Sequence, residues 1–183
     1  MDQSTQADPQ DTLARWLAEE EAMRSRLAAG TGHATRDQLA SMPGMAIFEA
    51  MFAGRLPPPA IGKTMDFMLI EVGPGRAVVQ GAPGPQHYNP LGSVHGGWFA
   101  TLLDSALGCA VHAALPAGKG YTTLELKVNL IRALSAKVPR VRAEGKVIHL
   151  GGQTATADAR LVGPDGKLYA HGSTTCLVFD LKA

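Results

Sequence analysis

The stretch Asn89-Pro90-Leu91-Gly92-Ser93-Val94-His95-Gly96-Gly97 and the apolar run WFATLLDSALGCAVHAALPAG, residues 98–118, decide the fold of this chain. The two glycines fit the start of a helix over about 97–115, and the free N–H groups of a helix N-terminus favour anionic oxygen. Asp104 is the only Asp, Glu, Lys or Arg in the apolar run. A carboxylate within an apolar helix is costly unless it is paired or used. The sequence therefore places an acid and an oxyanion donor on one helix, which indicates acyl chemistry.

Length and composition indicate a globular protein rather than a disordered one. The chain has 183 residues, of which 45% are hydrophobic and 18% charged, which predicts one domain with an extension. The net charge of +1 and the shortness of every basic block argue against nucleic acid as a partner. The polar N-terminus does not resemble a signal peptide, and Asp104 and His112 interrupt the longest apolar run. We therefore expect a cytoplasmic protein without a membrane partner.

The two cysteines give no sign of a metal centre. Cys109 and Cys176 lie in apolar segments, and their spacing fits neither a zinc site nor a disulfide framework. No nucleophile elbow, zincin motif or nucleotide-binding glycine motif occurs in the sequence. We therefore expect no metal and no cofactor.

The sequence predicts helices in the N-terminal third of the chain. Residues 11–29 fit an amphipathic helix with an aspartate as its N-cap, and residues 43–53 fit a second helix. Residues 56–59, Leu-Pro-Pro-Pro, are too rigid for a helix and lack the donors of a central strand. We therefore predict a helical N-terminal extension over 1–55 and a catalytic domain over 56–183.

The remaining segments read as strands on both sides of the apolar helix. The turn Gly163-Pro164-Asp165-Gly166 fits a hairpin between the last two strands. A helix that is apolar on nearly all sides is buried most easily by a curved antiparallel sheet wrapped around it. The sequence therefore predicts an α+β protein with the hotdog arrangement. Its predicted strands cover residues 64–72, 76–81, 121–132, 138–149, 153–162 and 168–179.

The spacing of Asp104 and Gly96 predicts an oligomer. Eight helical residues rise on the order of 12 Å, which is too far for one substrate carbonyl and one side chain to bridge. We therefore expect Asp104 of one copy to act with Gly96 of a second copy, in a homodimer with shared sites.

Other polar residues near Asp104 and Gly96 are candidate site residues, although each also has a possible structural role. Asn89 and His95 flank the loop before the helix and would hold a carbonyl group or fix the loop. Thr122 and Thr123 open a strand and would orient water or the carboxylate, although threonine is also simply common in strands.

Four segments of the chain resemble the PaaI-type hotdog thioesterases. They are residues 89–97, 104–108, 122–129 and 170–175, and the resemblance extends over about residues 55–180. It implies hydrolysis of acyl-CoA thioesters without a metal. It also implies a dimer of dimers with two active sites at each dimer interface.

The resemblance assigns roles to five positions. Asp104 matches the catalytic acid, which acts as general base or nucleophile, and Gly96 matches the residue whose N–H polarises the thioester carbonyl. Asn89 and His95 match groups at the thioester on the same subunit as that glycine. Thr123 matches a hydroxyl position next to the acid.

The contacts with the CoA phosphates differ from the family pattern. The family often has Arg-Pro after the third strand and Gly-Arg after the fourth, where this chain has Arg132-Ala133 and Gly151-Gly152-Gln153. Surface charge is the alternative role for every arginine considered. The candidate substrate-binding residues are Gly97, Thr122, Arg132 and Gly152, and the candidate substitutes for the missing arginine are Arg132, Arg140 and Arg142.

Two other functions fit the same pattern. One is a hotdog protein that binds acyl-CoA without hydrolysing it, and the other is a hotdog hydratase or dehydratase that uses His95 with an acid. The N-terminal residues would cover an acyl pocket or add to an interface. Five aromatic and methionine side chains are expected either to line an acyl pocket or to belong to the core. They are Phe48, Phe52, Met68, Trp98 and Phe99.

Overall fold

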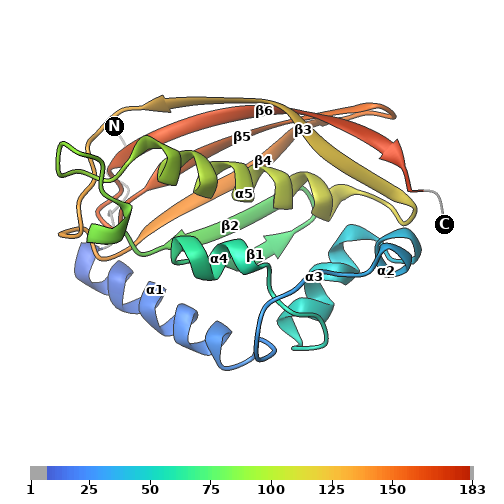
Figure 1. Cartoon of the computed structure of the whole chain (residues 1–183), viewed down its shortest axis with the longest axis horizontal. Coiled ribbons are helices and arrows are strands. Elements are labelled where there is room, and N and C mark those ends of the chain that lie inside the picture. The colour runs from blue at the N-terminus through green and yellow to red at the C-terminus, as the bar shows by residue number, and fades with distance from the viewer. Residues whose placement is uncertain (1–7, 182–183) are drawn as a thin grey trace, which may run out of the picture.

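A six-stranded antiparallel sheet curves around one long helix, α5 (Gly96–Ala114), in the computed structural model, which describes residues 8–181 (Figure 1). The strand order is β1-β2-β4-β5-β6-β3, so β1 and β3 form the two edges. The predicted α+β hotdog fold is confirmed. The strands are β1 (Phe67–Gly73), β2 (Arg76–Gly81), β3 (Lys119–Leu130), β4 (Val141–Leu150), β5 (Thr154–Val162) and β6 (Leu168–Asp180).

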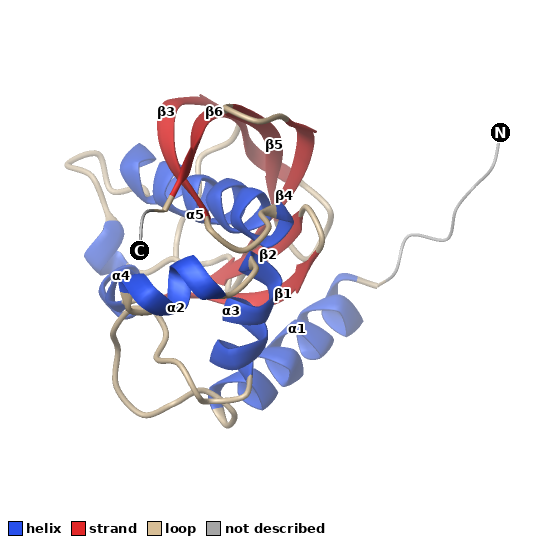
Figure 2. Ribbon diagram, turned by 90° about the vertical axis from the view of Figure 1, so that its right-hand side faces the viewer, coloured by secondary structure: helices blue, strands red, loops and turns tan. Residues whose placement is uncertain are grey.

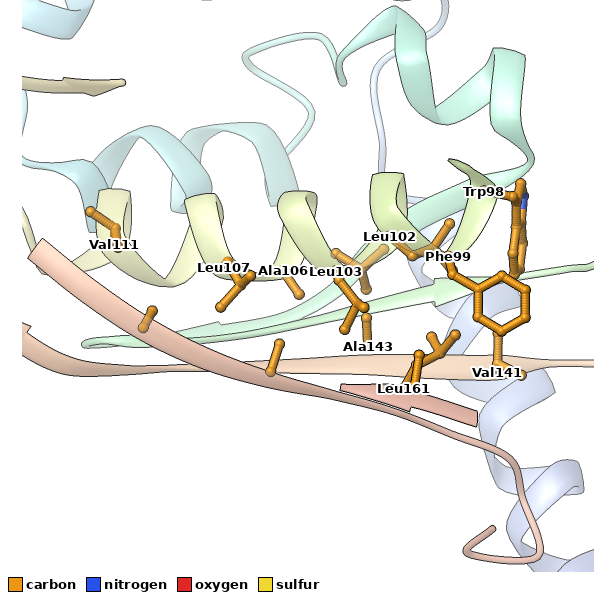
Figure 3. Packing of buried hydrophobic residues seen from close by; sticks show 14 of the residues in the cluster. Trp98, Phe99, Leu102, Leu103, Ala106, Leu107, Val111, Val141, Ala143 and Leu161 are labelled. Carbon is orange, nitrogen blue, oxygen red and sulfur yellow. The ribbon is translucent and has the colours of Figure 1, made fainter. Parts of the chain in front are cut away.

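The main core lies between α5 and the concave face of the sheet. Large side chains of the helix, including Leu102, Leu103 and Leu107, are fully buried there. They meet Ala143 of β4 and Leu161 of β5 (Figure 3). This packing explains why the helix is apolar on several sides. In the part of the chain that the structure describes, no helix is long and apolar enough to cross a membrane.

Small residues on the sheet allow the helix to approach closely. A Cβ atom built on Gly145 of β4 would lie 2.4 Å from the carbonyl oxygen of Ala106 and 3.0 Å from the amide nitrogen of Leu107. Both neighbours are helix backbone, which cannot move aside like the end of a flexible side chain. The position therefore admits only glycine at this helix–sheet distance.

We expect Gly145→Ala to lower the free energy of unfolding by about 1–3 kcal/mol, the usual cost of overpacking a core. Urea denaturation of the variant and the parent protein measures this difference. Gly73→Ala is the matched control, because a Cβ at Gly73 meets no atom within 4 Å. Equal losses in the two variants would contradict the role of close packing at Gly145.

The N-terminal third is helical, but its boundaries differ from the predicted ones. It forms four helices, and α2, α3 and α4 lie on the side of α5 away from β5 and β6 (Figure 2). Two of the four, α2 and α4, were not predicted. The helices are α1 (Pro9–Arg24), α2 (Arg36–Ser41), α3 (Gly44–Phe52) and α4 (Ala60–Met65), and a 3₁₀ turn covers Pro85–His87.

Local capping explains most of these differences. Asp8, not Asp11, caps α1, because its carboxylate accepts the N–H of Gln10 and proline follows at the first helical position. A capping box between Thr35 and Gln38 starts α2. The proline run ends at the N-cap of α4, so the first strand begins at Phe67 rather than at residue 64.

Helix α1 is fixed to the outer face of the sheet by a buried carboxylate. Glu20 is only 6% exposed. Its carboxylate accepts hydrogen bonds from Arg140 Nε at 2.6 Å, Gln80 Nε2 at 2.7 Å and Arg24 at 2.8 Å. Gly81 packs on α5, and Gln80, the preceding residue of β2, therefore points to the opposite face. Helix α1 thus covers the outer face of the sheet at Gln80 of β2 and Arg142 of β4.

Candidate functional site

Asp104 lies in the third turn of α5 and is half-buried. The hydroxyl of Thr123 on β3 donates to Asp104 Oδ1 at 3.3 Å. Thr123 pairs with Cys176 and Glu125 with Thr175, so Leu124 forms a bulge directly after the threonine. Among residues 8–181 no lysine, arginine or histidine forms an ion pair with Asp104. The acid is therefore oriented by a hydroxyl group and not neutralised by a cation.

A cavity of ≈ 620 Å³ opens beside Asp104. Its lining is mostly apolar, and it lies between the main core and a second apolar cluster centred on Ile47, Phe48 and Met51 of α3. Of the predicted pocket residues, Phe48 and Met68 line it. Phe99 belongs to the main core, and Phe52 packs against the second cluster.

Three residues that the sequence analysis did not assign to the site also line this cavity. Gly108 and Cys109 follow Asp104 by about one helical turn, a spacing that would have identified them. Burial and the nearby charge of Asp104 raise the pKa of Cys109 to about 12, so its thiol stays protonated. Burial likewise raises the pKa of Tyr121. Neither side chain is a nucleophile at neutral pH.

The N-terminus of α5 presents a free backbone donor. His95 is the N-cap, and its Nδ1 accepts the N–H of Gly97 at 2.9 Å. In residues 8–181 no acceptor contacts the N–H of Gly96. Gly96 and not Gly97 therefore keeps an N–H group for an oxyanion at the positive end of the helix.

The loop before α5 is held by Asn89 and His87. Asn89 Oδ1 accepts the N–H groups of Leu91 at 2.9 Å and Ser93 at 3.3 Å, and its Nδ2 donates to Ser93 Oγ at 3.1 Å. The carbonyl oxygen of His87 accepts the N–H of His95 at 2.8 Å. Both contacts fix the loop that carries the free N–H of Gly96.

His87 itself is buried in this loop against the start of α5. Its ring stacks on Trp98 with centroids 5.3 Å apart, and its Nδ1 accepts the N–H of Gly84. Burial lowers the pKa of His87, and the charge of Asp66 offsets part of this effect. The histidine is therefore a neutral packing residue of the loop, a role that the sequence analysis missed.

The two ends of the proposed machinery face different hollows within one chain. Asp104 and Thr123 line the ≈ 620 Å³ cavity, whereas His95 and Gly97 line a separate hollow of ≈ 390 Å³. Gly96 and Asp104 are eight residues apart on the same helix, a rise of about 12 Å. One chain therefore does not bring the acid and the donor together.

The remaining candidates lie away from Asp104. Thr122 is exposed, and strand alternation turns it away from its neighbour Thr123. Arg132 follows the end of β3, where its N–H bonds to the carbonyl of Tyr169. Gly152 lies in the open turn between β4 and β5.

Arg140 and Arg142 are not free to contact a CoA phosphate. Arg140 pairs with Glu20, and Arg142 pairs with Glu19 and stacks over Trp16 at 4.5 Å. From the sequence, these two arginines were candidates for the phosphates, with surface charge as the alternative. In the structure both side chains fix helix α1 to the sheet.

Comparisons with known proteins agree with this geometry. A profile of the Thioesterase superfamily matches residues 91–170, which include the α5 start, Asp104 and Thr123. "Putative esterase PA1618" of Pseudomonas aeruginosa is 36% identical over 81 residues, which is 44% of this chain and 54% of that protein. "Putative esterase VNG_1336C" of Halobacterium salinarum is 35% identical over 75 residues, which is 48% of that protein. The chain thus spans about half the length of the curated relatives it matches.

Two solved structures share most of their length with this chain. A thioesterase-like, phenylacetic acid degradation-related protein from Ralstonia eutropha JMP134 is 27% identical with a TM-score of 0.65, covering 71% of this chain and 98% of that one. A variant of the phenylacetic acid degradation protein PaaI from Thermus thermophilus is 29% identical with a TM-score of 0.58, covering 64% and 96%.

Proposed function

We propose that this chain, which matches the Thioesterase superfamily over residues 91–170 and has PaaI-type structural relatives, hydrolyses acyl-CoA thioesters to a free acid and CoA. The observation that carries this proposal is the position of Asp104. It is half-buried in an apolar helix, hydrogen-bonded to Thr123, without an ion pair among residues 8–181, and beside a cavity of ≈ 620 Å³. A carboxylate in this setting suits a general base or a nucleophile.

In the proposed reaction Asp104 takes a proton from water as the water oxygen attacks the thioester carbon. The carbonyl oxygen becomes negative and accepts the N–H of Gly96 from a second copy of the chain. The tetrahedral intermediate then breaks its C–S bond, and the CoA thiolate takes the proton from Asp104. If Asp104 instead attacks the carbon itself, the C–S bond breaks and the CoA thiolate leaves as the anhydride forms. Water then hydrolyses the anhydride to the free acid and the Asp104 carboxylate, and the remaining proton goes to the thiolate.

The edge strand β3 supports a site made by two copies. Its Leu124 and Leu130 are 61% and 54% exposed. Asp104 bonds to Thr123, and a Cβ on Gly96 would lie 2.9 Å from Leu130, so the two ends of the machinery adjoin the two ends of one strand. Antiparallel pairing of two β3 strands about Leu126 and Lys127 would set Thr123 of one copy opposite Leu130 of the other. Asp104 would then face Gly96 of the second copy.

The proposal includes the other features that the resemblance implies. Asn89 and His95 would act at the thioester through the loop that they hold, and Gly97, Thr122, Arg132 and Gly152 would contact the substrate. The dimers would associate in pairs in the cytoplasm. The division into an extension over 1–55 and a catalytic domain over 56–183 is likewise part of this proposal.

We expect the purified protein to release free thiol, together with the matching acid, from a panel of acyl-CoA thioesters. A thiol reagent follows the reaction continuously, and chromatography identifies the acid. Crotonyl-CoA separates the alternatives, because a hydratase would consume its double bond without releasing thiol. Calorimetric binding of acyl-CoA without thiol release would instead support a non-catalytic binding protein and overturn the proposed hydrolysis.

A further inference from the structure

The ≈ 620 Å³ cavity beside Asp104 is walled on one side by the N-terminal third of the chain. Leu27 and Ala28 reach it from the segment after α1, Phe48 and Met51 from α3, and Ile61 from α4. The opposite walls are the Ser105–Cys109 face of α5 and the strands β1 and β3. A segment far from Asp104 in sequence therefore shapes the space next to it.

We propose that the segment from Leu27 to Lys63 forms the outer wall of an acyl chamber and makes the protein selective for medium-chain and longer aliphatic acyl groups. This inference rests on the proposed thioester hydrolysis at Asp104. The segment adds nothing to the reacting atoms, and its role is to select the acyl group.

The chemistry of the walls fits an aliphatic chain. Phe48, Met51, Leu27 and Ile61 present hydrocarbon or thioether surface, and Asp104 stands at the α5 wall. The other charged side chains at the cavity come from helix ends, and one of them, Arg24, is paired with Glu20. An apolar hollow with a polar group on one wall binds a molecule that is apolar along most of its length and polar at one end.

The cavity is much larger than the smallest acyl groups. At about 30 Å³ for each water-sized group, ≈ 620 Å³ holds roughly twenty such groups. An acetyl group would leave most of this space empty, whereas an octanoyl or dodecanoyl chain would fill about half of it. Each methylene that leaves water for this cavity should raise kcat/KM by about fourfold until the chain reaches the far wall.

The test compares kcat/KM for acetyl-, butyryl-, octanoyl- and dodecanoyl-CoA in the parent protein and in two variants at neighbouring positions. Ala28→Trp places an indole in the cavity, whereas Ala29→Trp, one residue along, places it on an exposed position that does not line the cavity. We expect Ala28→Trp to lower kcat/KM for octanoyl-CoA by about tenfold or more and to change butyryl-CoA by less than about twofold. Ala29→Trp should leave both values unchanged.

A second blocking variant keeps the test decisive if Ala28→Trp does not fold. Ile61 lines the same cavity and is 47% exposed, so Ile61→Trp is a mild change for the fold and should also act on the long substrates alone. Equal kcat/KM for all four thioesters, or the same chain-length profile in every variant, would overturn the chamber.

The failure of the chamber is distinguishable from the failure of the proposed function. If no thioester releases thiol, hydrolysis fails, and calorimetry with octanoyl-CoA then tests the chamber alone. Binding that Ala28→Trp weakens by tenfold and Ala29→Trp preserves would support the chamber in that case. The absence of any binding would overturn it.

Discussion

Asp104→Asn is expected to lower the release of thiol from acyl-CoA by about a thousandfold without loss of the fold. Asparagine has the size of aspartate and its amide oxygen still accepts the hydroxyl of Thr123, which lies 3.3 Å from the carboxylate in the native chain. It can neither take a proton from water nor attack a thioester. The measurement is kcat/KM on an acyl-CoA that the parent protein hydrolyses.

The matched control is Asp158→Asn, which removes an exposed carboxylate on β5. It should keep full activity, and both variants should unfold at the urea concentration of the parent protein. Undiminished turnover in Asp104→Asn would contradict the role of this acid.

Asp104→Asn, combined with a second variant at Gly96, also tests whether two chains share one site. Gly96→Pro removes the free N–H at the first position of α5, where proline fits a helix and the preceding His95 has the extended backbone that proline requires. Each variant alone should be nearly inactive. A mixture allowed to exchange subunits should recover about a quarter of the parent activity, because half of the dimers carry one intact site out of two. No recovery after proven exchange would place both residues in the same chain's site.

A single turnover in ¹⁸O-labelled water separates the two chemical roles of Asp104. A general base directs the label straight into the product acid. A nucleophile forms an anhydride first, and water that opens this anhydride at the Asp104 carbonyl leaves the label in the Asp104 carboxylate. Label found in Asp104 after one turnover would therefore identify the nucleophilic role.

Glu20→Gln is expected to cost about 3 kcal/mol of folding free energy at pH 7. Burial alone would raise the pKa of Glu20, but hydrogen bonds from Arg140, Arg24 and Gln80 outweigh it and lower the pKa from 4.5 to about 2. A shift of this size corresponds to about 3 kcal/mol at 1.36 kcal/mol per pH unit. Glutamine is neutral and leaves the two arginines without their carboxylate.

The pH dependence of the Glu20 effect has a defined sign. Because the pKa of the folded state is lowered, the stabilisation is complete above about pH 4.5 and is lost as the pH falls toward about 2. Urea denaturation should therefore show that the difference in free energy of unfolding between the parent protein and Glu20→Gln becomes smaller over this range. Glu21→Gln, an exposed neighbour in α1, is the control. If Glu20→Gln lost no more unfolding free energy at pH 7 than Glu21→Gln, the stabilising role of the buried network would be contradicted.

The sequence predicted the centre of the fold better than its N-terminal third. The apolar run after Gly97 fixed the place of α5 within one residue, and the alternation of strands gave all six with small errors at their ends. Helix α4 was missed because the prolines before it were read as a barrier, although proline also precedes helices. The role of Glu20 was not predicted, because only the folded chain brings Gln80 and Arg140 to it.

The candidate site was predictable only in its local parts. Asp104 and the helix start stand out because an acid interrupts an apolar run directly after two glycines. The bond between Thr123 and Asp104 depends on how β3 returns along α5, and the cavity walls come from segments up to about a hundred residues apart. No spacing rule within one segment reports such contacts.

The position of Asp104 beside the apolar cavity also bears on how a product would leave. In the proposed reaction the new acid forms within reach of this carboxylate and ionises at neutral pH. Two anions at such short range repel each other, more strongly beside an apolar wall than in water. The side chain that starts the reaction would thus also drive the fatty acid out, and the enzyme would resist inhibition by its own product.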